Sequence, residues 1–138
     1  MKEEYLSTLK LVSLCLHGGD KSLVKSEDLK NSYAELMNQA IVPIVAGALG
    51  SNPFGERSMD AMGVFLGNFR NYNLILAEQD KLFALLDKND ISFAILKGAS
   101  AAMYYRNPEH RTVGDIDIII ESDRFHDALK IFEDGGYR

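Results

Sequence analysis

Two aspartates spaced two residues apart, Asp115 and Asp117, are the clearest candidates for chemistry in this chain. They enter a run of isoleucines at positions 116 and 118–120, and such β-branched residues favour a strand. Alternate side chains of a strand share one face, so the two Cβ atoms would lie roughly 6 to 7 Å apart. Hard oxygen ligands of this kind suit Mg²⁺ or Mn²⁺ bound to a substrate phosphate. The alternative is that both are ordinary charged residues at the end of a strand.

A glycine upstream, Gly98, predicts a second part of the same site. The apolar run that begins at Ile91 and ends at Gly98 favours a strand, and the residues from Ala99 to Tyr105 open a helical pattern. Glycine lets the backbone approach a ligand closely, and the free N–H groups at the start of a helix attract phosphate. Together the two segments predict a site for a metal and a polyphosphate, although Gly98 would also suit a plain turn between a strand and a helix.

The residues that suggest a family are Leu96-Lys97-Gly98-Ala99-Ser100, Tyr104-Tyr105-Arg106-Asn107-Pro108, Arg111 and Asp115-Ile116-Asp117-Ile118. In this order and spacing they resemble the signature of the DNA polymerase β-like nucleotidyltransferase superfamily. Within it, the pattern is most similar to uncharacterised bacterial nucleotidyltransferases that carry L-K-G, then R, then D-I-D. Many members of the superfamily have Gly-Gly or Gly-Ser after the first strand, where this chain has Gly-Ala-Ser.

The resemblance implies transfer of a nucleoside monophosphate from an NTP to a hydroxyl of a small molecule or a protein. Asp115 and Asp117 would be the catalytic residues, holding two Mg²⁺ or Mn²⁺ ions together with a third carboxylate from a later strand. The residues expected to bind the NTP are Lys97, Gly98, Ala99, Ser100, Arg106 and Arg111. The lysine and the second arginine match the family pattern, whereas Arg106 is inferred from its position. Each of these cations would also be ordinary as a solvated surface charge.

The segment after Asp117 offers no residue for the third carboxylate. A helix capped by Ser122 or Asp123 and ended by Gly135 is expected there. Glu121 would lie about 13 Å from Asp117 along an extended strand, too far to share a metal ion. We therefore expect an amino-terminal fragment of a longer enzyme, or a truncated product, that is weak or inactive by itself. The alternative is a non-catalytic interaction module that binds a partner through its helical half.

The first ninety residues are expected to be helical. Together with the strands expected after them, they make the predicted fold class α+β. A mostly helical region, residues 1–88, would precede an incomplete nucleotidyltransferase core of β-α-β-α order with a small sheet, residues 89–138. The first expected helix runs from Leu6 to Leu16 and is closed by His17 to Asp20. The second begins at Ser26 and is bent or restarted by Pro43. After a loop at Gly50 to Gly55, the third is capped by Ser58 or Asp60 and runs to Asp90.

Composition restricts the location and the partners. The 138 residues carry a net charge of -5, which argues against an extended surface for duplex nucleic acid. Cys15 is the sole cysteine, so an intrachain disulfide is excluded and a reducing cytoplasm is expected. No apolar run approaches the roughly 20 residues of a membrane-spanning helix. The expected partners are an NTP and an unidentified hydroxyl acceptor.

Overall fold

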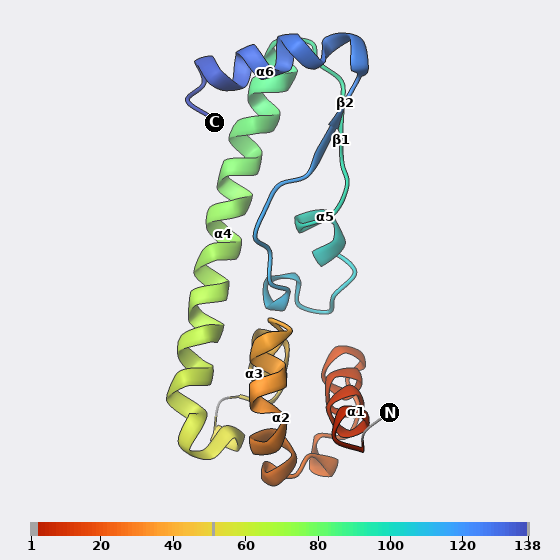
Figure 1. The fold of residues 1–138 in the computed structure, drawn as a ribbon, viewed down its shortest axis with the longest axis vertical. Coiled ribbons are helices and arrows are strands. Elements are labelled where there is room, and N and C mark those ends of the chain that lie inside the picture. Colours follow the sequence, from red (N-terminus) through yellow and green to blue (C-terminus); the bar gives the residue numbers. More distant parts are fainter. Residues whose placement is uncertain (1–2, 51, 138) are drawn as a thin grey trace.

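The computed structural model describes residues 3–50 and 52–137, and most of them are helical (Figure 1). This confirms the predicted α+β class, mostly helical with a small sheet. The helices are α1 (Glu3–His17), α2 (Ser26–Asn38), α3 (Val42–Leu49), α4 (Ser58–Lys88), α5 (Ala99–Ala102) and α6 (Phe125–Asp134), and the strands are β1 (Phe93–Ile95) and β2 (Ile118–Ile120). Short 3₁₀ turns lie at Lys21–Leu23, Asn52–Arg57, Pro108–His110 and Ser122–Arg124.

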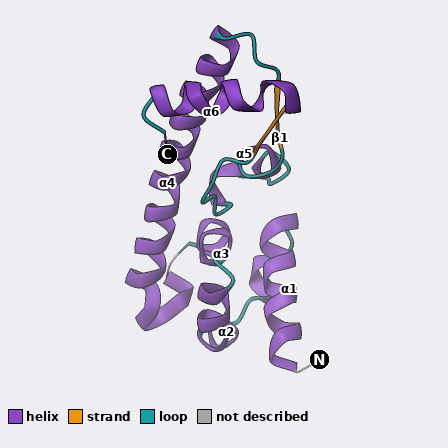
Figure 2. Cartoon of the chain, turned by 45° about the horizontal axis from the view of Figure 1, so that its top comes forward, coloured by secondary structure: helices purple, strands orange, loops and turns teal. Residues whose placement is uncertain are grey.

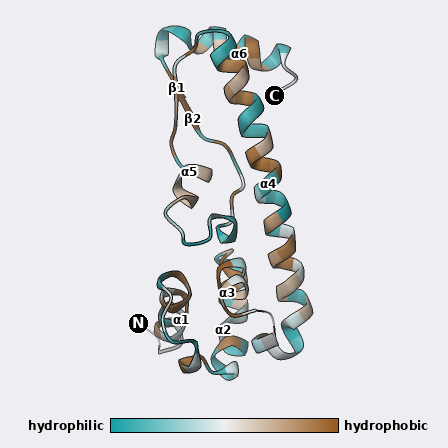
Figure 3. Ribbon diagram, turned by 180° about the vertical axis from the view of Figure 1, so that it is seen from behind, coloured by the Kyte–Doolittle hydropathy of each residue, from teal (hydrophilic) through white to brown (hydrophobic). Residues whose placement is uncertain are grey.

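Helix α4 runs along the length of the molecule and joins its two ends (Figure 1). At 1.5 Å per residue its 31 residues are about 46 Å long. Apolar and polar segments alternate along it, as Figure 3 shows. Ala61 near its start belongs to a core shared with α1, α2 and α3, whereas Leu86 near its end belongs to a core under the sheet. The predicted long helix is therefore confirmed.

Across residues 3–50 and 52–137, no helix is both long and apolar enough to cross a bilayer.

The larger core lies between the first three helices and the start of α4. Its fully buried members include Leu29, Leu36, Val42 and Phe54. Pro43 sits in the first turn of α3, where a proline costs no backbone hydrogen bond. Helix α2 ends at Asn38 and α3 begins at Val42, which confirms the predicted restart of the helix at the proline.

The two strands form an antiparallel pair next to α6 (Figure 2), and Phe93 of β1 contacts Phe83 of α4. Phe93 pairs with Ile120 and Ile95 with Ile118, and the alternate pair is formed by Ala94 and Ile119. Phe93, Ile118 and Ile120 pack against Leu86, Ile91 and Ala128, with Ile131 and Phe132 of α6 completing this core. Ala94 and Ile119 are exposed, so one face of the pair is buried and the other faces solvent.

Three local predictions are wrong. Helix α5 ends at Ala102 rather than Tyr105, and the residues between it and Pro108 make only turns. Arg57 occupies the capping position of α4, while Ser58 lies inside the helix and its hydroxyl donates to the Gly55 carbonyl. Likewise, Arg124 and not Ser122 or Asp123 precedes α6, because the residues before it form a 3₁₀ turn. The predicted end at Gly135 is the observed C-cap.

Candidate active site

The antiparallel pairing of β1 and β2 continues beyond the strands and brings the two predicted motifs together. The Leu96 N–H donates to the Asp117 carbonyl at 3.1 Å, and the same register places Gly98 opposite Asp115. The prediction that both aspartates lie within a strand needs correction, since β2 begins one residue after the pair. The ladder stops there because the opposite chain turns away at Gly98. The glycine turn and the carboxylate pair are nevertheless neighbours across one ladder.

Gly98 is required by the shape of the turn. Its φ of 71° and ψ of -120° lie in a region that side-chain-bearing residues rarely adopt. A Cβ at this position would lie 3.1 Å from the Asp115 carbonyl oxygen and 3.7 Å from a Val113 methyl. The backbone of the turn therefore fits closely against the segment that carries the aspartates.

Lys97 and Asp117 form an ion pair in the centre of this arrangement. The Lys97 Nζ lies 3.0 Å from Asp117 Oδ2, with the lysine side chain 59% exposed and the aspartate 31% exposed. The neighbouring Asp117 carboxylate raises the pKa of Lys97, and Asp115 adds to this effect. Oδ2 itself is buried, and within the described part of the chain no donor is aligned to form a hydrogen bond with it. The Lys97 ammonium, 3.0 Å away, is thus the cation that faces this buried oxygen.

Arg111 contacts the glycine turn from the other side. Its Nη1 donates to the Gly98 carbonyl at 3.0 Å, and its charge partly counters the rise in the Lys97 pKa. Ala99 is buried, and the Ser100 hydroxyl donates to the Lys97 carbonyl, so both stabilise the turn. The site therefore combines two cations, two carboxylates and a tight backbone turn.

Arg106 lies apart from this group. Its Nη1 approaches Gly18 at the end of α1, where a Cβ on the glycine would meet it at 2.7 Å. The same region includes Cys15, Tyr105 and His110. Of the six predicted NTP-binding residues, the structure brings the other five together around the turn and places this arginine next to the helical region.

Asp115 and Asp117 supply oxygen atoms of the kind that hard divalent cations bind. Asp115 is exposed, and Asp117 offers a buried oxygen without an aligned donor. No cluster of three or more His, Cys, Asp or Glu side chains is present among residues 3–50 and 52–137. Mg²⁺ is often bound by one or two carboxylates together with substrate phosphates and water, so a pair suffices for such binding.

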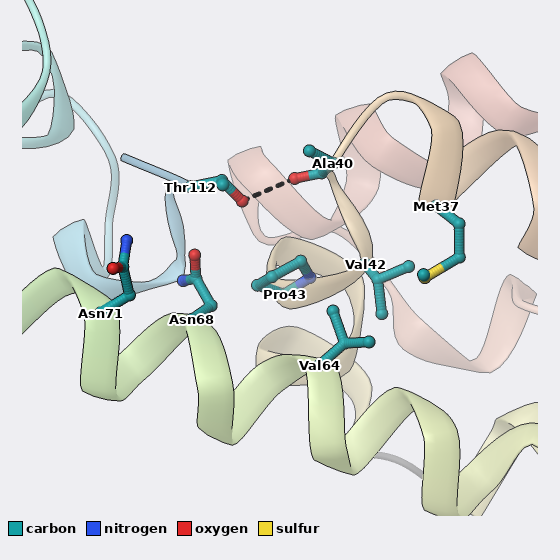
Figure 4. Close-up of a pocket in the computed structure, with 8 residues that line it drawn as sticks. All are labelled: Met37, Ala40, Val42, Pro43, Val64, Asn68, Asn71 and Thr112. Atoms are coloured by element: carbon teal, nitrogen blue, oxygen red, sulfur yellow. Dashed lines mark hydrogen bonds between the residues drawn. The ribbon is translucent and has the colours of Figure 1, made fainter. Parts of the chain in front are cut away.

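Sequence reasoning missed the residues that hold the loop between α5 and β2. From α4, Asn68 Nδ2 donates to the Glu109 carbonyl at 2.8 Å and Asn71 Nδ2 to the Val113 carbonyl at 2.6 Å. Thr112 donates to the Ala40 carbonyl at 2.7 Å, a contact drawn in Figure 4. The only sequence signal was a pair of asparagines three residues apart in a long helix, which places them on one face.

A cavity of about 300 Å³ adjoins these contacts (Figure 4). Its walls include Met37, Val42, Pro43 and Val64, and none of its lining residues is charged. A triphosphate would find no counter-charge there, so the cavity is a poor candidate for the NTP.

The comparison with protein families gives one match. The model of a family described as "uncharacterised nucleotidyltransferase" matches residues 25–138. No curated protein and no solved structure matches significantly. The matched region includes the ladder, the turn and the aspartate pair.

Proposed function

The chain belongs to the uncharacterised nucleotidyltransferase family, and from this premise we propose metal-dependent transfer of a nucleoside monophosphate from an NTP to a hydroxyl of a small molecule or protein. The observation that carries the proposal is the ladder. It places Gly98 opposite Asp115 and allows Lys97 to reach Asp117. A phosphate-binding turn and a metal-binding pair would thus serve one substrate.

The cations and the turn would bind the triphosphate. Lys97 is largely exposed and an exposed ion pair is weak, so its ammonium can move from Asp117 to a phosphate oxygen. Arg111 already reaches the backbone of the turn and offers further N–H donors to the phosphates. Gly98 is buried, so its part would be to shape the turn at which Lys97 and Arg111 meet.

Asp115 and Asp117 would hold Mg²⁺ or Mn²⁺. When bound, the ion would neutralise phosphate charge and activate the acceptor hydroxyl for in-line attack. The two aspartates would position the ion beside the turn. Asp117 would then bind the ion in place of the Lys97 ammonium. Because the described residues contribute only two carboxylates to the site, we expect this chain to bind the NTP better than it turns it over.

A non-catalytic module is the second candidate function. It is favoured by the absence of a third acidic or histidine ligand near the pair within the described residues. Such a module would retain the fold and bind a partner protein through α1 to α4. It would not need an intact aspartate pair.

Nucleotide binding by a charge-matched pair of variants separates these proposals. The double variant Asp115→Asn, Asp117→Asn keeps the side-chain shapes and removes two negative charges. Asp80→Asn, Asp87→Asn makes the same charge change at exposed positions of α4. We expect calorimetry to show that the first variant loses Mn²⁺-dependent NTP affinity by more than about tenfold, because charged contacts are lost. The control is expected to stay within about twofold.

Circular dichroism of all three proteins verifies that the helices are intact. Equal NTP affinity for the wild type and the Asp115, Asp117 variant would contradict the nucleotidyltransferase proposal and favour the interaction module.

A further inference from the structure

We propose that Asn71 of α4 is a positioning residue that holds Arg111 at the glycine turn. Together with Asn68 it donates to the carbonyls of Val113 and Glu109, which lie two residues after and two residues before Arg111. Both asparagines extend from the same helix towards the loop, as Figure 4 shows. The arginine therefore lies in the middle of a segment fixed at both sides.

The loop needs such external donors because it has little regular structure of its own. Between α5 and β2 only a 3₁₀ turn is assigned, so most carbonyls of this segment receive no helical or sheet hydrogen bond. A main-chain carbonyl that is removed from water and receives no hydrogen bond from the protein destabilises the fold. The side-chain amides of α4 supply two of these donors.

Asn71 is the contact nearest to the turn. It binds the carbonyl of Val113, whose buried side chain lies beside the position that a Gly98 Cβ would occupy. Arg111 then closes the connection by donating to the Gly98 carbonyl. Helix α4, the loop and the turn are thus joined by side-chain donors, with the Val113 side chain beside the turn.

Two further contacts hold the loop at the residues on either side of Arg111. His110 packs edge-on against Phe65 of α4 and fills the space beside Gly47 of α3. Thr112 donates to the Ala40 carbonyl between α2 and α3. With these in place the loop stays folded when the Asn71 contact is lost, so the expected change is a local displacement near Arg111.

Asn71→Asp replaces the amide donor by a carboxylate that cannot donate and that repels the Val113 carbonyl. Asn73→Asp is the matched control. It introduces the same charge two residues away, and Asn73 donates only to the Phe69 carbonyl of its own helix. Asn71→Leu removes the donor without adding charge and separates the two effects.

Amide hydrogen exchange tests the contact without any nucleotide. We expect faster exchange in residues 96–102 and 107–115 for Asn71→Asp and Asn71→Leu, and wild-type exchange for Asn73→Asp. Arg111→Gln should raise exchange in residues 96–102 to a similar degree, because the Gly98 carbonyl loses the same donor. Wild-type exchange in both Asn71 variants would overturn the proposal.

A double-mutant cycle tests whether Asn71 acts through Arg111, and this part rests on the proposed function. We expect Asn71→Asp to lower Mn²⁺-NTP affinity about 3- to 10-fold in the wild-type background, and less than about twofold in Arg111→Gln. Additive losses would overturn the positioning role. If the wild type binds no NTP, the proposed function fails, and the exchange result alone decides the role of Asn71.

Discussion

Replacing Gly98 by alanine tests the turn at the centre of the candidate site. Its φ of 71° and ψ of -120° cost a residue with a side chain about 1 to 3 kcal/mol. The new Cβ would also lie 3.1 Å from the Asp115 carbonyl oxygen, so one of the two backbone segments must shift. We expect Gly98→Ala to lower the free energy of unfolding by about 2 kcal/mol. With a urea m-value of about 2 kcal/mol/M, the unfolding midpoint falls by about 1 M.

Gly114→Ala is the matched control, because Gly114 has no positive φ and no atom lies within 4 Å of the position of its Cβ. We expect a change of no more than about 0.5 kcal/mol for this variant. Below both midpoints, Gly98→Ala should also bind Mn²⁺-NTP at least about tenfold more weakly than Gly114→Ala, because the turn faces the aspartates. Equal urea midpoints for the two variants would refute the reasoning.

Two further changes test charges at and near the site. Lys97→Met removes the cation that occupies Asp117, so we expect calorimetry to show Mn²⁺ alone binding about two- to fivefold more tightly and NTP more weakly; unchanged affinities for both would contradict this. Burial lowers the pKa of His110 in the folded protein below its ordinary value of 6.5. Below pH 6.5 the unfolded chain therefore takes up a proton before the folded protein does. The contribution of His110 to stability is complete above pH 6.5 and decreases as the pH falls towards the lower pKa of the folded state. Urea unfolding at about pH 5.5 and 7.5 should show a larger loss for the wild type and for His126→Gln, which changes an exposed histidine, than for His110→Gln.

Local sequence signals predicted most of the fold. The restart at Pro43 and the long helix α4 follow from the fixed φ of proline and from helical periodicity. The isoleucines after Asp117 predicted β2, but not its start, because strand pairing ends where the opposite chain turns at Gly98. Such limits depend on the partner strand, which a single segment cannot reveal.

Long-range contacts were beyond local reasoning. Arg106 is five residues from Arg111 in sequence, yet the turn at Pro108 directs it towards α1. Asn71 reaches Val113 across 42 residues, and nothing in the sequence links the two. The roles predicted for Asp115 and the other site residues stay predictions until binding is measured, although the structure gathers most of them at the turn.

The pairing of Lys97 with Asp117 explains how such a site can exist before any substrate arrives. Asp115 and Asp117 both raise the pKa of Lys97, so its ammonium attracts both carboxylates and reduces the repulsion between them. The lysine is largely exposed, so its ion pair is weak and its release costs little. Arg111, by contrast, is held through a loop that α4 fixes. Under the proposed function, one cation would therefore be free to follow the phosphates, while the other keeps the turn in place.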